Sequence, residues 1–123
     1  MPFDTTNFAP TRILTPTEQL DLEILQKARD GVASKGGWCQ NVLNGESGRS
    51  HCALGWLFFY AADEKTAADI VANRLSPVLP HSRASRDRPE PKVYVVRFND
   101  SSRTRKADVV TLFDRAIARL QQI

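Results

Sequence analysis

The stretch "GRSHCALGWLFFYAA" (residues 48–62) decides the fold that we predict for this chain. It predicts a helix that begins after Ser50, a residue type that caps helix N-termini, and runs to Ala62. Its side chains are apolar on nearly every face, which is typical of a buried helix. Gly55 costs about 1 kcal/mol relative to alanine inside a helix, so we expect close contact with another backbone there. We therefore place this helix at the centre of the fold.

The segment before this stretch predicts an amphipathic helix. In "TPTE" (residues 15–18) Thr15 is the expected N-cap, Pro16 suits the first helical position, and Glu18 has the spacing of a capping box. Gly36 and Gly37 end the helix. Apolar residues recur every four positions, which predicts one buried face: Leu20, Ile24, Ala28 and Val32.

Two further helices are predicted after the central one. Asp63 is the expected N-cap of a helix over about residues 64–75. Thr104 is the expected N-cap of the last helix. The last helix carries an apolar stripe at helical spacing, formed by Val109, Leu112, Phe113, Ala116, Ile117 and Leu120.

The segment between these helices predicts a loop and a strand. Residues 76–91 contain four prolines and no periodicity. "KVYVVRF" (92–98) is rich in β-branched and aromatic residues, so we expect a strand, paired with either residues 38–43 or the N-terminal arm. The predicted fold class is mostly α, with about four helices around a buried central helix and a small β element that includes residues 92–98. We expect an N-terminal arm (1–14) and a single globular domain (15–123) with a Pro/Arg-rich loop at 76–91.

Composition is that of an ordinary globular protein. Of the 123 residues 41% are hydrophobic, and the longest apolar run, at 53–62, has 10 residues. A bilayer-spanning helix needs about 20. "MPFDTTNFAP" (1–10) lacks the basic start and apolar core of a signal peptide. With only two cysteines, we expect reduced thiols in a cytoplasmic protein that does not contact a membrane.

Cys52 is the candidate nucleophile of this chain. Its predicted place in the first turn of a helix favours a thiolate. An enzyme reading would use Cys52 with His51 as base and Asp100 as acid. However, His51 is its neighbour in sequence, and adjacent helical residues point about 100° apart. We favour the alternative that Cys52 is a small buried residue, and that the chain is not an enzyme.

A zinc site would have to combine four scattered side chains. The available ligands are Cys39, His51, Cys52 and His81, and their spacing lacks the paired ligands that zinc sites use. We expect no metal and no cofactor.

The positive charge is concentrated in residues 81–106. This segment holds three acids and a net charge of +5, in a chain whose total is +3. Its cations are Arg83, Arg86, Arg88, Lys92, Arg97, Arg103, Arg105 and Lys106. A concentrated positive field attracts polyanions. We interpret the segment as a surface for an acidic protein partner, because arginine is favoured in interfaces and no nucleic-acid motif is present. Nucleic acid is the alternative partner for the same surface.

Three motifs resemble those of a family of small bacterial and phage-associated proteins of unknown function, the DUF6197-like group. They are "GGWCQN" (36–41), "HCALGWL" (51–57) and "RFNDSSRTRKADVVTLFDRAI" (97–117). The sequence departs from the family pattern at His51 and Phe98, where tryptophan is usual, and at Ser102, where glycine is usual. The resemblance supports the order of the elements and implies no activity.

The motifs also predict a polar network. We expect Gln40, Asn99, Asp100 and Arg103 to form one network that locks residues 37–41 onto the last helix. A buried network of this kind is tolerated only when every group is satisfied. For Asn99 and Asp100 taken alone, a turn before a helix is the favoured interpretation.

The function expected from these observations is that of a non-enzymatic protein-binding module, such as a modulator encoded by a phage or another mobile element. A nucleic-acid-binding protein and a thiol enzyme are the two alternatives. The oligomeric state is left open by the sequence.

Overall fold

The computed structural model describes residues 12–80 and 90–122, and they are mostly helical. In chain order they form α1 (Pro16–Ala33), α2 (Ala53–Tyr60), α3 (Glu64–Ile70), the π-helical turn η2 (Val71–Leu75), the 3₁₀ turn η3 (Ser76–Val78), α4 (Pro91–Asp100) and α5 (Lys106–Gln121). The predicted helical class is confirmed. The predicted loop residues 81–89, and most of the predicted N-terminal arm, lie outside the described residues.

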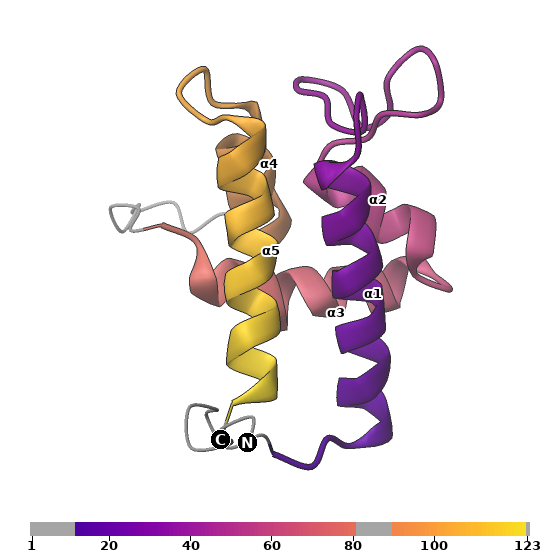
Figure 1. Ribbon diagram of the computed structural model, residues 1–123, viewed down its shortest axis with the longest axis vertical. Coiled ribbons are helices and arrows are strands. Elements are labelled where there is room, and N and C mark those ends of the chain that lie inside the picture. The colour runs from indigo at the N-terminus through magenta and orange to yellow at the C-terminus, as the bar shows by residue number, and fades with distance from the viewer. Residues whose placement is uncertain (1–11, 81–89, 123) are drawn as a thin grey trace, which may run out of the picture.

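Helices α1 and α5 form an antiparallel pair, with α2 and α3 behind it in the view of Figure 1. The capping box predicted at α1 is confirmed: Thr15 Oγ1 accepts from the Glu18 N–H, and Glu18 Oε1 accepts from the Thr15 N–H. Leu20, predicted on the buried face, is 47% exposed. Helix α5 buries the predicted stripe apart from the half-buried Ile117, but its N-cap is Arg105, not Thr104.

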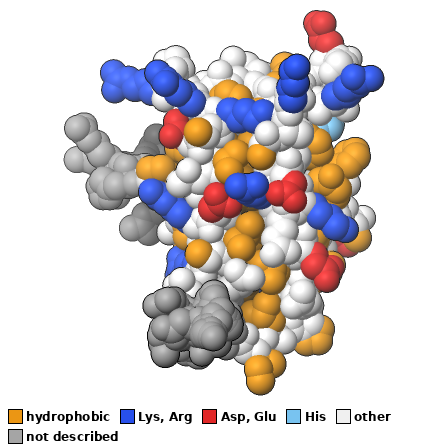
Figure 2. Space-filling view, in the orientation of Figure 1, with side chains coloured by type: hydrophobic (Ala, Val, Ile, Leu, Met, Phe, Trp, Pro, Cys, Tyr) orange, Lys and Arg blue, Asp and Glu red, His pale blue; other side chains and the backbone are white. Residues whose placement is uncertain are grey.

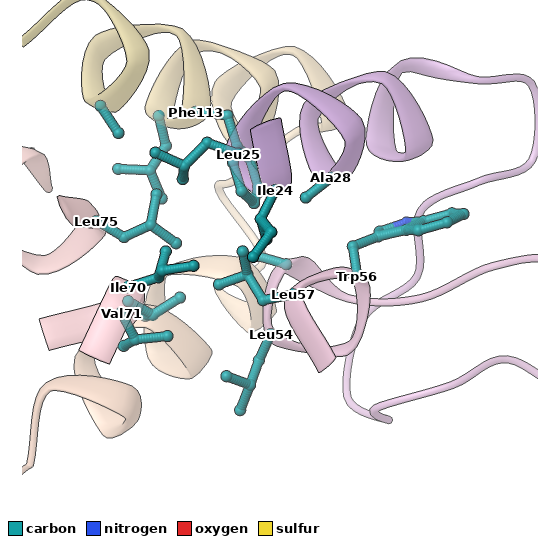
Figure 3. Packing of buried hydrophobic residues seen from close by; sticks show 14 of the residues in the cluster. Ile24, Leu25, Ala28, Leu54, Trp56, Leu57, Ile70, Val71, Leu75 and Phe113 are labelled. Carbon is teal, nitrogen blue, oxygen red and sulfur yellow. The ribbon is translucent and has the colours of Figure 1, made fainter. Parts of the chain in front are cut away.

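The hydrophobic core lies between this pair and the crossing helices. Figure 3 shows Leu25 of α1 and Phe113 of α5 facing Leu57 of α2 and Ile70 of α3. All four side chains are fully buried. The Trp56 ring lies flat against Gly31 of α1, where an added Cβ would sit 2.6 Å from the ring. Glycine at this position therefore lets α1 and α2 approach closely.

The central helix differs from its prediction in its start, in its burial and in its end, which is at Tyr60 and not at Ala62. It begins one residue after Cys52, whose Sγ accepts from the Gly55 N–H at 3.3 Å, so Cys52 and not Ser50 is the N-cap. The expected close contact at Gly55 is confirmed, since a Cβ there would lie 2.3 Å from the Leu43 carbonyl oxygen. Only Ala53–Leu57 is buried, and the residues that follow to Tyr60 are exposed.

The predicted strand at 92–98 is wrong, because these residues belong to α4. Pro91 occupies the first turn, where its fixed φ and missing N–H suit a helix. Val95 and Asn99, four residues apart, share the buried face. This burial outweighs the β propensity of the valines. Among the described residues the β structure is limited to isolated bridge residues: Trp38 and Asn44, which each pair with His51, and Gln122.

Candidate functional site

Asn99, near the C-terminal end of α4, is a buried polar residue at the centre of the hydrogen-bonded site. It is 1% exposed, and both ends of its carboxamide are satisfied. Its Oδ1 accepts from Trp38 Nε1 at 2.7 Å and from the Ala53 N–H at 3.0 Å. Its Nδ2 donates to the Cys39 carbonyl at 3.1 Å and to Asp100 Oδ1 at 2.9 Å. A buried amide with all four bonds made rigidifies its surroundings.

The Asn99 side chain completes a short parallel pairing between two distant segments. The His51 N–H donates to the Gly37 carbonyl at 3.0 Å, and the Cys39 N–H donates to the His51 carbonyl at 3.4 Å. In a continued parallel ladder the next bond would join the Ala53 N–H to the Cys39 carbonyl. The carboxamide of Asn99 lies between these two groups and bonds to both. One side chain of α4 therefore ties the start of α2 to the loop after α1.

Gln40 holds the turn between α4 and α5. Its Nε2 donates to the carbonyls of Asn99 and Ser101, both at 2.9 Å, and to that of Thr104 at 3.4 Å. These carbonyls lie at or beyond the end of α4, where no intrahelical donor is available. Asp100 Oδ1 accepts from the Asn41 N–H at 2.8 Å. The loop after α1 and the turn after α4 therefore form one connected unit.

Of the four residues of the predicted network, the structure brings together Gln40, Asn99 and Asp100. Arg103 is exposed, and its backbone N–H donates to Ser101 Oγ at 3.3 Å. Within the described residues its guanidinium makes no hydrogen bond or ion pair with a side chain. Sequence reasoning missed the indole of Trp38 as a network member, although Trp38 and Asn99 lie in two of the three motifs.

Cys52, His51 and Asp100 do not form a catalytic triad in this arrangement. Cys52 is 4% exposed, and burial raises the pKa of its thiol. The His51 Nδ1 bonds to Asn44 Oδ1, and its ring meets that of Trp56 edge-on at a centroid distance of 4.5 Å. Burial lowers the pKa of His51. No hydrogen bond joins the three side chains to one another in the part of the chain that the structure describes.

The candidate zinc ligands that the structure describes, Cys39, His51 and Cys52, do not form a metal site either. Among the described residues there is no group of three or more His, Cys, Asp or Glu side chains that could hold a metal ion. The half-buried Cys39 donates its thiol to the Val42 carbonyl at 3.6 Å. His81 lies outside the described residues.

The predicted basic surface divides into separate parts. Arg83, Arg86 and Arg88 lie outside the described residues. Lys92 is at the start of α4, 3.6 Å from Glu90, and the exposed Arg97 is in the last turn of the same helix. A helix of ten residues is about 15 Å long, so Lys92 is remote from the turn that follows α4.

The remaining three predicted cations join two others in what we call the basic end of the molecule. The Lys106 ammonium donates to the Ser34 carbonyl, which links the turn before α5 to the end of α1. Residues 34–50 and 101–106 contain a single acid, Glu46, and five cations, Lys35, Arg49, Arg103, Arg105 and Lys106. Figure 2 shows lysine and arginine side chains along the upper edge of the molecule, where Figure 1 places these loops.

Comparison with known proteins identifies one family. A family model described as "Family of unknown function (DUF6197)" matches residues 16–119. No curated protein and no solved structure matches the chain. Among the helices that the structure describes, none combines the length and the apolar character needed to cross a membrane.

Proposed function

Because this chain belongs to DUF6197, a family of unknown function, we propose its function from the site alone: it is a non-enzymatic binding module whose basic end takes an acidic surface of a partner protein. One observation supports this most directly. Gln40 draws the carbonyls of Ser101 and Thr104 inward, while Arg103 and Arg105 between and beside them are exposed. The turn therefore presents cations on a backbone that is already ordered, which lowers the entropy lost on binding.

The charge balance at this end also favours an anionic partner. Its five cations outnumber the acids beside them, Glu46, Asp100 and Asp108. Asp100 accepts from the Asn41 N–H and Asp108 from the Arg105 N–H, both at 2.8 Å. The start of α5 adds the positive end of a helix dipole. Such a field speeds encounter with an acidic surface and sets the orientation of the complex.

We propose a non-enzymatic function because the surroundings of Cys52 do not suit a catalytic thiol. A buried thiol with a raised pKa remains protonated near neutral pH, and His51 is directed at Asn44 and the Trp56 ring. We further propose a cytoplasmic modulator encoded by a phage or another mobile element. The resemblance to phage-associated proteins supports that origin, and the genomic neighbours of the gene test it.

A charge-reversal experiment tests the proposed surface. The variant Arg49→Glu/Arg103→Glu/Arg105→Glu replaces three exposed cations of the basic end. The matched control Lys27→Glu/Arg115→Glu/Arg119→Glu changes charge equally on exposed residues of α1 and α5. The probes are a fluorescent 20-residue polyglutamate peptide and a 20-base-pair DNA duplex, titrated by anisotropy at about 50 mM salt, where phosphate contacts are strong.

The two partner classes give different results. We expect the peptide to bind, and the basic-end variant to weaken it at least about tenfold while the control variant loses less. Equal losses in both variants, or no peptide binding, would refute the proposal. Tighter binding of the duplex than of the peptide, lost in the same variant, would assign the surface to nucleic acid instead.

A further inference from the structure

We propose that the groove beside the exposed end of α2 is a second binding site, which takes an apolar segment of a partner protein flanked by lysine or arginine side chains. This inference is independent of the basic end, because it uses the opposite charge on another part of the surface. We call this site the acidic groove, and it consists of two adjoining hollows on either side of Phe58.

The floor of the acidic groove is apolar. One hollow, of about 340 Å³, lies between α2, α3, η2 and the start of α4, and Leu54, Val71 and Pro91 line it. The other is lined by Leu43 and by the residues that follow α2. Phe58 and Glu64 line both hollows, so the two are adjacent. A concave apolar surface with a polar rim is typical of a site for a partner side chain.

Two further exposed aromatic side chains, Phe59 and Tyr60, follow Phe58 in α2 and pack beside His51 and Trp56. Phe58 is 37% exposed, Phe59 62% and Tyr60 36%. Phe59 and Tyr60 meet edge-on at 5.0 Å, and Phe59 lies 5.4 Å from the His51 ring. Figure 2 shows hydrophobic side chains gathered beside the pale-blue histidine. Contiguous exposed aromatic groups of this kind mark protein interaction sites.

The rim of the groove carries the charge that selects the occupant. Four carboxylates line the two hollows, against the single cation Lys92: those of Asp63, Glu64, Asp69 and Glu90. Lys92 pairs with Glu90 at 3.6 Å, and Lys65 pairs with Asp69 at 2.9 Å. The rim is therefore negative in a chain whose total charge is +3. A basic flank on the occupant complements it.

The negative charge of the rim disfavours three other occupants of the groove: a second copy of this chain, an anionic lipid surface and nucleic acid. Two copies of this chain joined by a two-fold axis through the groove would place Glu64 and its neighbours opposite the same carboxylates. Anionic lipid headgroups and nucleic acid would be repelled in the same way. A cationic, apolar protein segment satisfies both the floor and the rim.

A pair of designed peptides tests this inference. The probe is a 16-residue amphipathic peptide with leucine at helical spacing and lysine elsewhere, and its counterpart has glutamate in place of every lysine. Binding is measured by calorimetry, and the contacted residues are mapped by ¹⁵N chemical shifts. Phe58→Ser removes the shared apolar wall, and Glu64→Lys reverses the charge of the carboxylate that lines both hollows without altering the core. Leu20→Ser and Glu23→Lys are matched controls on exposed positions of α1.

We expect the lysine peptide to bind with shifts confined to the groove. Phe58→Ser and Glu64→Lys should each weaken it at least about tenfold, the size expected for a central interface residue, while the α1 controls bind normally. The glutamate peptide should bind at least about tenfold more weakly than the lysine peptide. Equal binding of the two peptides, shifts elsewhere, or unchanged affinity in both groove variants would overturn the proposal. A dimer that Phe58→Ser dissociates would overturn it in favour of a second copy.

Discussion

The two halves of α2 are both apolar and have opposite surroundings. Ala53–Leu57 is buried and is held by the Cys52 cap, by the hydrogen bond that the Ala53 N–H donates to Asn99 Oδ1, and by the contact of Gly55 with Leu43. Phe58–Tyr60 is equally apolar but projects beside a groove with an acidic rim. Apolar side chains in the first half of α2 therefore form part of the core, whereas those in the second half form an exposed apolar surface.

The anchoring of the buried half depends most on Asn99. Asn99→Leu keeps the approximate volume but leaves Trp38 Nε1, the Ala53 N–H and the Cys39 carbonyl without partners. We expect the free energy of unfolding to fall by about 4 kcal/mol, because each unpaired buried group costs about 1–3 kcal/mol. Urea denaturation measures this loss. The exposed Asn73→Leu is the matched control, with an expected change within about 0.5 kcal/mol. A loss of less than about 1 kcal/mol in Asn99→Leu would show that the network does not stabilise the fold.

Truncating one side chain in each half of α2 compares how much the two halves contribute to the stability of the fold. Leu57 is fully buried, and Leu57→Ala should lower the free energy of unfolding by about 3 kcal/mol through the cavity it leaves. Phe59 is 62% exposed, and Phe59→Ala should cost less than about 1 kcal/mol although it removes a larger side chain. Thermal or urea denaturation of both variants checks this order. Equal losses would mean that the exposed half is part of the core, and that the groove beside it is not a preformed surface.

The sequence predicted those elements whose local signals agree with their packing. Thr15 and Glu18 cap α1, and Asp63 caps α3 by accepting from the Thr66 N–H, because caps act over three residues and need no distant partner. The α4 prediction failed because Val93, Val95 and Val96 carry β propensity. The competing helical signal, Pro91 followed by the four-residue spacing of Val95 and Asn99, becomes decisive only once both residues are packed.

The candidate site could be predicted only in part, because its contacts also depend on how distant segments pack. The motifs drew attention to Gln40, Asn99 and Asp100, but the bridging of Cys39 and Ala53 by one carboxamide depends on three segments that meet only in the fold. The exposure of Phe58–Tyr60 likewise depends on where the covering elements stop. Apolar periodicity does not contain that information.

We expect the free energy of unfolding to depend on pH through His51, which lies where the two halves of α2 meet. This is the smallest of the three predicted effects on stability. This buried ring contacts Trp56 of the first half and Phe59 of the second. Burial lowers its pKa below the ordinary 6.5, so the folded protein binds the proton less readily than the unfolded chain does. Its contribution to stability is complete above the unfolded pKa, is lost as the pH falls toward the folded pKa, and levels off below it.

The variant His51→Gln isolates this contribution because glutamine can still donate to Asn44 Oδ1 but does not titrate near neutral pH. Urea midpoints of the native chain and the variant, compared between about pH 7.5 and pH 5, should diverge as the pH falls, with the native chain losing more. Carboxylates that titrate below this range affect both proteins alike, so the difference reports His51. Parallel curves would show that the ring is solvated in the folded state. Water would then reach His51 where the two halves of α2 meet, and Trp56, packed against Gly31, would mark the edge of the core.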